Sequence, residues 1–118
     1  MKFNIEVYEK ENGEVPFDVF VAQLTPKMRA KLFRDLDILE AFGNDLREPL
    51  SKSLGQGIFE LRTKFGTDII RSLYFFFVNQ RIIITHGFIK KDDKTPKSEI
   101  DKAKEYKEDW LRRYGNEV

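Results

Sequence analysis

The chain has 118 residues, of which 41% are hydrophobic and 35% charged. This length and balance predict one folded domain, residues 1–118, and exclude a disordered or low-complexity chain. The sequence has no cysteine and one histidine. It therefore excludes disulfides, thiolate metal sites and cysteine nucleophiles, and it predicts neither a metal nor another cofactor.

The net charge of +1 hides an uneven distribution. Residues 50–97 carry nine basic and four acidic side chains, whereas residues 1–49 carry seven basic and ten acidic. A local basic surface attracts nucleic acid even when the whole chain is nearly neutral, although an ordinary solvated face has the same composition.

The chain shows no feature of a membrane protein. Its first residues lack the apolar run of a signal peptide, and no stretch has the roughly 18 apolar residues of a membrane span. We expect a cytoplasmic protein without membrane contact.

The first third predicts a strand followed by two helices. Residues 3–8 alternate apolar and polar, which is the period of a half-buried strand. A helix is expected from Pro16, where apolar residues recur at helical spacing. Thr25 and Pro26 indicate the start of a second helix, with threonine as its N-cap, and Gly43 is placed to end it in a left-handed conformation.

The middle of the chain changes to the period of strands. Residues 58–62, 69–78 and 81–89 are rich in aromatic and β-branched residues and are separated by short turns, which predicts an antiparallel meander. The second and third runs are apolar on both faces, as in strands covered on both sides.

A last helix is expected after Thr95 and Pro96, which repeat the cap signal. The predicted order β-α-α-β-β-β-α indicates an α+β fold, in which helices pack on a sheet dominated by antiparallel strands.

Four pieces of the sequence together resemble a known family. They are Leu54-x-x-Gly57-x-x-Glu60-Leu61-Arg62, Ile70-Arg71-x-x-Tyr74, Ile84-Thr85-His86-Gly87-Phe88-Ile89-Lys90-Lys91 and Thr95-Pro96-x-x-Glu99-Ile100-x-x-Ala103. In this order they resemble the RelE/ParE toxin superfamily, in particular its HigB-like branch.

The resemblance implies a compact RelE-like fold and the toxin of a type II toxin–antitoxin system. The RelE and HigB members of this superfamily are endoribonucleases that cut mRNA on the translating ribosome without a metal, so the resemblance implies this activity here. The toxin's implied partner is a HigA-like helix-turn-helix antitoxin, through which the complex binds operator DNA. Two alternatives stay open: a ParE-like inhibitor of DNA gyrase, and a relative that binds its partner without toxicity.

Metal-free cleavage uses the RNA 2′-hydroxyl as nucleophile, so basic side chains suffice to stabilise charge on the phosphate. Arg71 is the first candidate, because it interrupts an apolar strand and matches the family's arginine. The alternative is an ion pair with Asp68 or Glu60. Arg62 matches the family's Leu-Arg piece, and for it phosphate contact and a salt bridge with Glu60 are both open.

Three more candidates lie in the third strand run. Lys90 and Lys91 match the family's lysine pair, and one of them is expected to contact the scissile phosphate or to act as the acid. His86 has a side chain suited to proton transfer near neutral pH. By strand alternation it shares a face with Ile82 and Ile84, so a packed core histidine is the alternative.

RNA contacts are expected from Lys64, Lys94 and Tyr74. The tyrosine would stack on a base, with a core position as the alternative. Classical RelE members have a tyrosine after the basic strand end, whereas residues 95–100 contain none.

Overall fold

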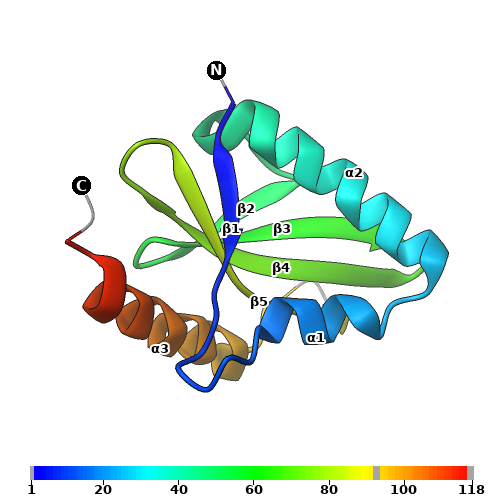
Figure 1. Ribbon diagram of the computed structural model, residues 1–118. Helices are drawn as coiled ribbons and strands as arrows, with labels where there is room; N and C mark the ends of the chain where they lie inside the picture. The colour runs from blue at the N-terminus through cyan, green and yellow to red at the C-terminus, as the bar shows by residue number, and fades with distance from the viewer. Residues whose placement is uncertain (1, 92–93, 117–118) are drawn as a thin grey trace.

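The computed structural model describes residues 2–91 and 94–116 and shows a twisted sheet with helices on both faces (Figure 1). Its elements are β1 (Asn4–Val7), α1 (Pro16–Ala22), α2 (Pro26–Phe42), the short 3₁₀ helix η1 (Gly43–Asp45), β2 (Ser51–Gly55), β3 (Ile58–Phe65), β4 (Asp68–Phe77), β5 (Arg81–Lys90) and α3 (Lys97–Tyr114).

The sheet has five strands in the order β1-β5-β4-β3-β2. Strand β1 runs parallel to the first half of β5, and every other neighbouring pair is antiparallel. The α+β class and the predominantly antiparallel sheet are confirmed.

Strand β2 was not expected from the sequence. Its residues, Ser51–Gly55, include one large apolar side chain, Leu54, so neither a strand period nor β-branched enrichment marks them. The segment is extended because it pairs with β3 at the sheet edge, which is a tertiary contact.

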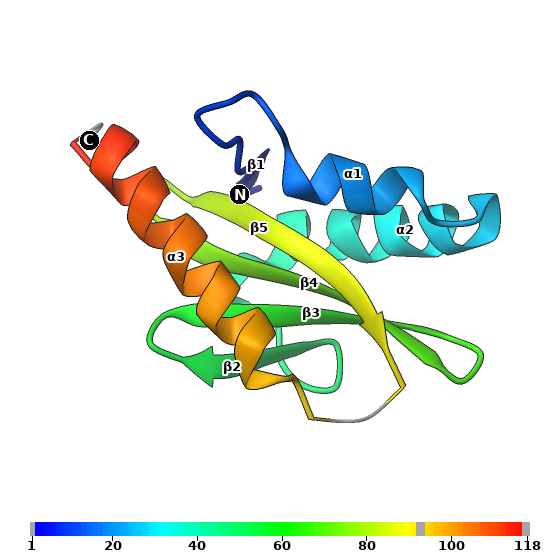
Figure 2. The same ribbon diagram turned by 90° about the horizontal axis from the view of Figure 1, so that it is seen from below.

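Two hydrophobic cores lie on opposite faces of the sheet. Figure 2 shows α3 across one face, with α1 and α2 on the other. Leu32 and Leu39 of α2 pack in one core, and Ala103 and Trp110 of α3 pack in the other. Strands β4 and β5 contribute to both cores, which confirms that they are covered on both sides.

The predicted start and end of α2 are also observed. The hydroxyl of Thr25 accepts a hydrogen bond of 3.2 Å from the backbone N–H of Met28. Gly43 ends the helix at a positive φ of 50°, and a Cβ at this position would overlap the ring of Phe3. Glycine is therefore required both by the backbone conformation and by the close approach of the ring.

A bulge in β5 corrects the expected position of His86. Tyr74 pairs with Ile84 and Leu73 pairs with His86, so Thr85 is an extra residue, and its hydroxyl donates to the carbonyl of Leu73 at 3.1 Å. From Thr85 onward, the extra residue exchanges the faces of the sheet toward which successive side chains of β5 point. As a result, Ile84 faces the α1–α2 side while His86 faces α3.

In the described part of the chain, no helix combines the length and apolarity that a membrane span requires.

Candidate functional site

On the face of the sheet that α3 covers, most candidate site residues lie in three rows that run across β3, β4 and β5. Strand pairing aligns Glu60 with Leu73 and His86 in the first row. The second row is Arg62, Arg71 and Phe88, and the third is Lys64, Ile69 and Lys90. The first row therefore carries an acidic side chain, whereas the second and third rows each carry two basic side chains.

A buried polar cluster of Glu60, Arg71 and Thr95 lies at the centre of these rows. The Nη1 atom of Arg71 donates to Oε1 of Glu60 at 3.1 Å and to the hydroxyl of Thr95 at 3.0 Å. The Thr95 hydroxyl in turn donates to the same carboxylate oxygen at 2.7 Å. Both charged side chains are fully buried.

The structure thus shows the ion pair with Glu60 that was the alternative reading of Arg71. Direct phosphate contact by this arginine would require its guanidinium to leave a fully buried carboxylate. Separating such a pair is costly, because each charge then lies in the protein interior without the other.

Thr95 does not cap α3, contrary to the sequence expectation. The N-cap of α3 is Pro96, and among the described residues no side-chain hydrogen bond caps the helix. The Thr95 hydroxyl is directed inward to Glu60 and Arg71 instead. This contact ties the segment between β5 and α3 to the middle of the sheet.

Arg62 borders the buried cluster. Its Nε atom lies 4.0 Å from Oε2 of Glu60, and its side chain is 11% exposed. It can therefore contribute positive charge beside Glu60 while reaching the surface with part of its guanidinium.

Five exposed lysines lie near the three rows, and we call them the surface lysines: Lys52, Lys64, Lys90, Lys91 and Lys94. Lys64 and Lys90 are in one row with Ile69 between them, so their strands are about 10 Å apart. Lys52 and Lys94 line a hollow of about 390 Å³ beside Thr95. This hollow adjoins the N-terminus of α3, whose dipole adds to the positive potential.

His86 lies under α3 and is nearly buried. Its Nε2 atom is 3.1 Å from Oε1 of Glu99, and its Nδ1 atom is 3.1 Å from the Thr85 hydroxyl. Burial lowers the pKa of His86 below 6.5, and the hydrogen bond and charge of Glu99 oppose this shift. Lys90 lies four residues farther along β5, so its Cα is roughly 13 Å from that of His86 at strand spacing.

Tyr74 lies on the opposite face of the sheet from Arg71 and His86. It is 1% exposed, and its hydroxyl is 2.6 Å from the hydroxyl of Ser51. Burial raises the pKa of Tyr74. Its ring belongs to the core against α2, which was the alternative reading.

The structure therefore places Arg62, Arg71, Lys64 and Lys90 on one face of the sheet, with His86 one row inward, and it places the ring of Tyr74 on the opposite face. Sequence reasoning missed the roles of Thr95, Glu99 and Lys52. Thr95 and Glu99 belong to the last of the four motif pieces. Lys52 lies on β2, a strand that no sequence pattern predicted. The described residues contain no group of histidine, aspartate and glutamate side chains that could hold a metal ion.

Comparison with known proteins agrees with this architecture. The model of the family described as Phage derived protein Gp49-like (DUF891) matches residues 20–108. The chain belongs to the Gp49-like family. Comparison with curated proteins gave no significant match.

A chain from the crystal structure of the archaeal RelE-RelB complex from Pyrococcus horikoshii OT3 is similar in structure to this Gp49-like chain. The TM-score is 0.52 at 14% sequence identity, and the match covers 80% of this chain and 100% of that one. The RelE-like fold implied by the sequence is thereby confirmed, whereas the HigB-like branch stays a prediction.

Proposed function

We propose that this Gp49-like protein is the toxin of a type II toxin–antitoxin system and a metal-independent endoribonuclease that cuts mRNA in the cytoplasm. The observation that carries the proposal is the group of surface lysines near the buried Glu60–Arg71–Thr95 cluster, on a RelE-like fold. Exposed lysine ammonium groups beside a rigid, buried cluster are suited to bind the phosphate backbone of RNA and to orient one phosphate within it.

In the proposed reaction, the 2′-hydroxyl loses its proton and attacks the adjacent phosphorus. The bond from phosphorus to the 5′ oxygen breaks, and that oxygen takes up a proton. This leaves a 2′,3′-cyclic phosphate and a 5′-hydroxyl. Because negative charge develops on the phosphate oxygens, ammonium groups directed at them stabilise the transition state more than the ground state.

We assign phosphate contact to Lys90, Lys91, Lys64 and Lys94, because these side chains are exposed. Arg71 acts through Thr95 as a positioning residue, since its guanidinium is buried against Glu60 and Thr95. His86 belongs to the proposed site as a proton carrier paired with Glu99, one row from Arg71. Tyr74 is proposed to support RNA binding from the other face.

The proposed partners are a HigA-like helix-turn-helix antitoxin, which binds operator DNA in the complex, and the translating ribosome. The solved relative was crystallised as a RelE-RelB complex, which supports an antitoxin partner for the fold.

The test is primer extension on a defined mRNA after brief induction, together with purified protein and the same mRNA with and without translating ribosomes. We expect cuts that appear only with ribosomes. The double variant Lys90→Gln/Lys91→Gln should lose most of the cutting without unfolding, while Lys27→Gln, an exposed lysine on α2, should keep it.

Cuts on naked RNA would show that the protein is a nuclease and that its reaction does not need the ribosome. No cuts under either condition, from folded protein that still arrests growth, would contradict the proposal and favour inhibition of DNA gyrase.

A further inference from the structure

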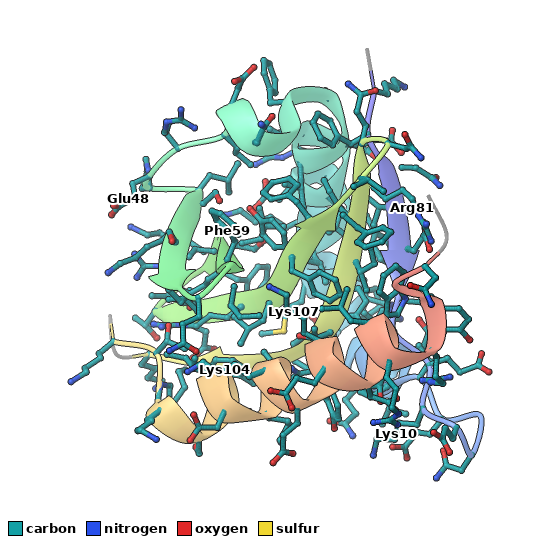
Figure 3. The ribbon with its side chains drawn as sticks, turned by 90° about the vertical axis from the view of Figure 1, so that its left-hand side faces the viewer. Lys10, Glu48, Phe59, Arg81, Lys104 and Lys107 are labelled. Carbon is teal, nitrogen blue, oxygen red and sulfur yellow. The ribbon has the colours of Figure 1, made fainter. Side chains whose placement is uncertain are left out.

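A hollow with an aromatic floor lies on the face of the sheet opposite Lys64 and Lys90. Its floor is formed by Phe59, Tyr74 and Phe76, and we call it the aromatic hollow. Its volume is about 480 Å³, and a second hollow of about 580 Å³ shares Phe59 and Phe76 with it. Figure 3 shows Phe59 between β2 and the segment that follows α2.

The aromatic hollow lies just beyond the C-terminal end of α2, where Gly43, Asn44 and Arg47 line it. None of the described large side chains covers the floor completely at this point. Phe59 and Phe76 are consequently only partly buried, although both pack against the core. The Phe59 ring is stacked on Tyr74 with centroids 5.7 Å apart and meets the edge of Phe76 at 5.1 Å. These contacts hold the rings in fixed orientations at the surface.

Polar groups surround this apolar floor. Asn44, Ser51 and Ser53 line the hollow, and Arg47 and Lys52 add positive charge to its rim. Glu48 also belongs to the rim, but it projects outward from the edge of the molecule (Figure 3). Amide and hydroxyl groups beside a stacked ring match the chemistry of a nucleobase, which has an aromatic face and a hydrogen-bonding edge.

The size of the hollow also favours a small aromatic group over a protein surface. Its volume is within the range of small-ligand pockets. A stable protein partner would need about 800 Å² of buried surface on this chain. An apolar anchor from a protein would also leave the polar lining groups without hydrogen-bond partners, which costs free energy.

The edge strand β2 connects the aromatic hollow to the surface lysines. Lys52 and Ser53 line both the aromatic hollow and the hollow beside Lys94 and Thr95, which lies on the α3 face. Because β2 is the last strand of the sheet, a single strand of RNA can pass around it without crossing a covered surface.

We propose that the aromatic hollow binds one unpaired nucleobase of single-stranded RNA, stacked on Phe59 and in contact with Phe76 at its edge, while Lys52 contacts the phosphate that passes over β2. This inference rests on the proposed function, because it makes the hollow the subsite for a nucleotide flanking the cut. The hollow then determines base preference, since its polar rim meets the edge of the base.

The first experiment measures binding without cleavage. The probe is a fluorescent single-stranded oligonucleotide of 2′-O-methyl nucleotides, which lacks the nucleophile and cannot be cut. Phe59→Leu retains an apolar side chain but removes the ring, and we expect about tenfold weaker binding, the loss typical of one stacked base. Phe33→Leu is the matched control, because Phe33 is a 47% exposed phenylalanine of α2 outside the hollow.

The second experiment uses the wild-type chain and therefore does not depend on the folding of a variant. The same probe carrying one 5-iodouridine is irradiated, and the crosslinked peptide is identified by mass spectrometry. Crosslinks at Phe59 or Phe76 are the expected result. Crosslinks confined to other surfaces, with Phe59→Leu binding the probe as tightly as wild type, would overturn the inference.

Two further outcomes separate this inference from the proposed function. If wild-type protein cuts mRNA and Phe59→Leu cuts it with unchanged rate and base preference, the protein is a nuclease but the aromatic hollow is not a base-binding subsite. If Phe59→Leu weakens only the binding of a cognate protein partner and not of RNA, the hollow is a protein-binding site and the inference is overturned.

Discussion

At the scale of single residues, we expect the largest change in the free energy of unfolding when one partner of the buried Glu60–Arg71 pair is replaced. Two buried charges are stable together because each compensates for the desolvation of the other. The Thr95 hydroxyl completes the arrangement by contacting both. The pair therefore connects the stability of the sheet to the position of the segment that carries Lys94.

We expect Glu60→Gln to lower the free energy of unfolding by about 3–5 kcal/mol, because the Arg71 charge then lies buried without this carboxylate. Urea denaturation measures the change. Glu48→Gln, at an exposed position, should change it by no more than about 0.5 kcal/mol. Equal, small effects in the two variants would contradict the role given to the pair.

The double variant Glu60→Leu/Arg71→Met separates stability from positioning. Replacing both charges with apolar groups should recover much of the lost stability. Thr95 would still lose both partners, so RNA cutting should stay low. A stable double variant that cuts at the wild-type rate would show that the cluster does not position the site.

His86 should make stability depend on pH. Because burial holds its pKa below 6.5, the unfolded chain binds a proton at higher pH than the folded protein does. The free energy of unfolding therefore falls as pH decreases below about 6.5, and this decrease stops once the folded histidine is also protonated. His86→Gln should lack this part of the decrease in urea titrations from about pH 7.5 to about pH 5. If the free energy of unfolding changed with pH in the same way in wild type and His86→Gln, His86 would not cause this pH dependence.

At the scale of elements, α3 is attached to the sheet at both of its ends. The N-terminal end is held through Thr95, as described above. At the C-terminal end, the Tyr8 hydroxyl donates to Oδ2 of Asp109 at 2.6 Å, and Arg113 contacts the same oxygen at 2.7 Å. These contacts join α3 to the segment just after β1, which is distant in sequence.

We expect Tyr8→Phe to reduce the free energy of unfolding by about 1.5–3 kcal/mol at neutral pH, the range for a hydrogen bond to a charged group. Burial and the Asp109 hydrogen bond raise the pKa of Tyr8 to about 12. Wild-type stability should therefore fall as pH rises from about 10 toward 12, because the unfolded tyrosine ionises first. Tyr114→Phe, at a 37% exposed position, is the control for both measurements. An equal loss in the two variants would contradict this role of Tyr8.

At the scale of the whole molecule, the nearly neutral net charge is divided between surfaces. The segment with the basic excess folds into β2 to β5 and the approach to α3, so its lysines gather at one end of the sheet. The resulting field depends on geometry as well as on net charge, and it attracts polyanions to that end.

Binding of single-stranded RNA should therefore weaken steeply with salt. The slope of log K against log salt concentration is about −0.7 for each phosphate neutralised on a single strand. We expect each glutamine replacement at Lys64, Lys90 or Lys94 to reduce the magnitude of the slope by about 0.7, whereas Lys27→Gln leaves it unchanged. An unchanged slope in all variants would place the RNA elsewhere.

Local patterns in the amino-acid sequence predicted the kinds of elements and much of their order. Hydrophobic periodicity, the Thr25 cap and Gly43 indicated the helices, and the apolar runs indicated β3 to β5 with β4 and β5 covered on both sides. These features depend on neighbours within a few residues, so a local pattern carries them. The basic excess and the motif pieces also identified the region of the candidate site.

The arrangement of the site residues depends on long-range contacts in the fold. The bulge at Thr85 turned His86 toward α3, and the buried carboxylate of Glu60 drew the Thr95 hydroxyl away from the helix start. Pairing with β3 created β2, and packing at the edge of the core left Phe59 partly buried. Each outcome depends on strand register or on contacts between residues far apart in the chain, and such contacts leave no local pattern in the sequence.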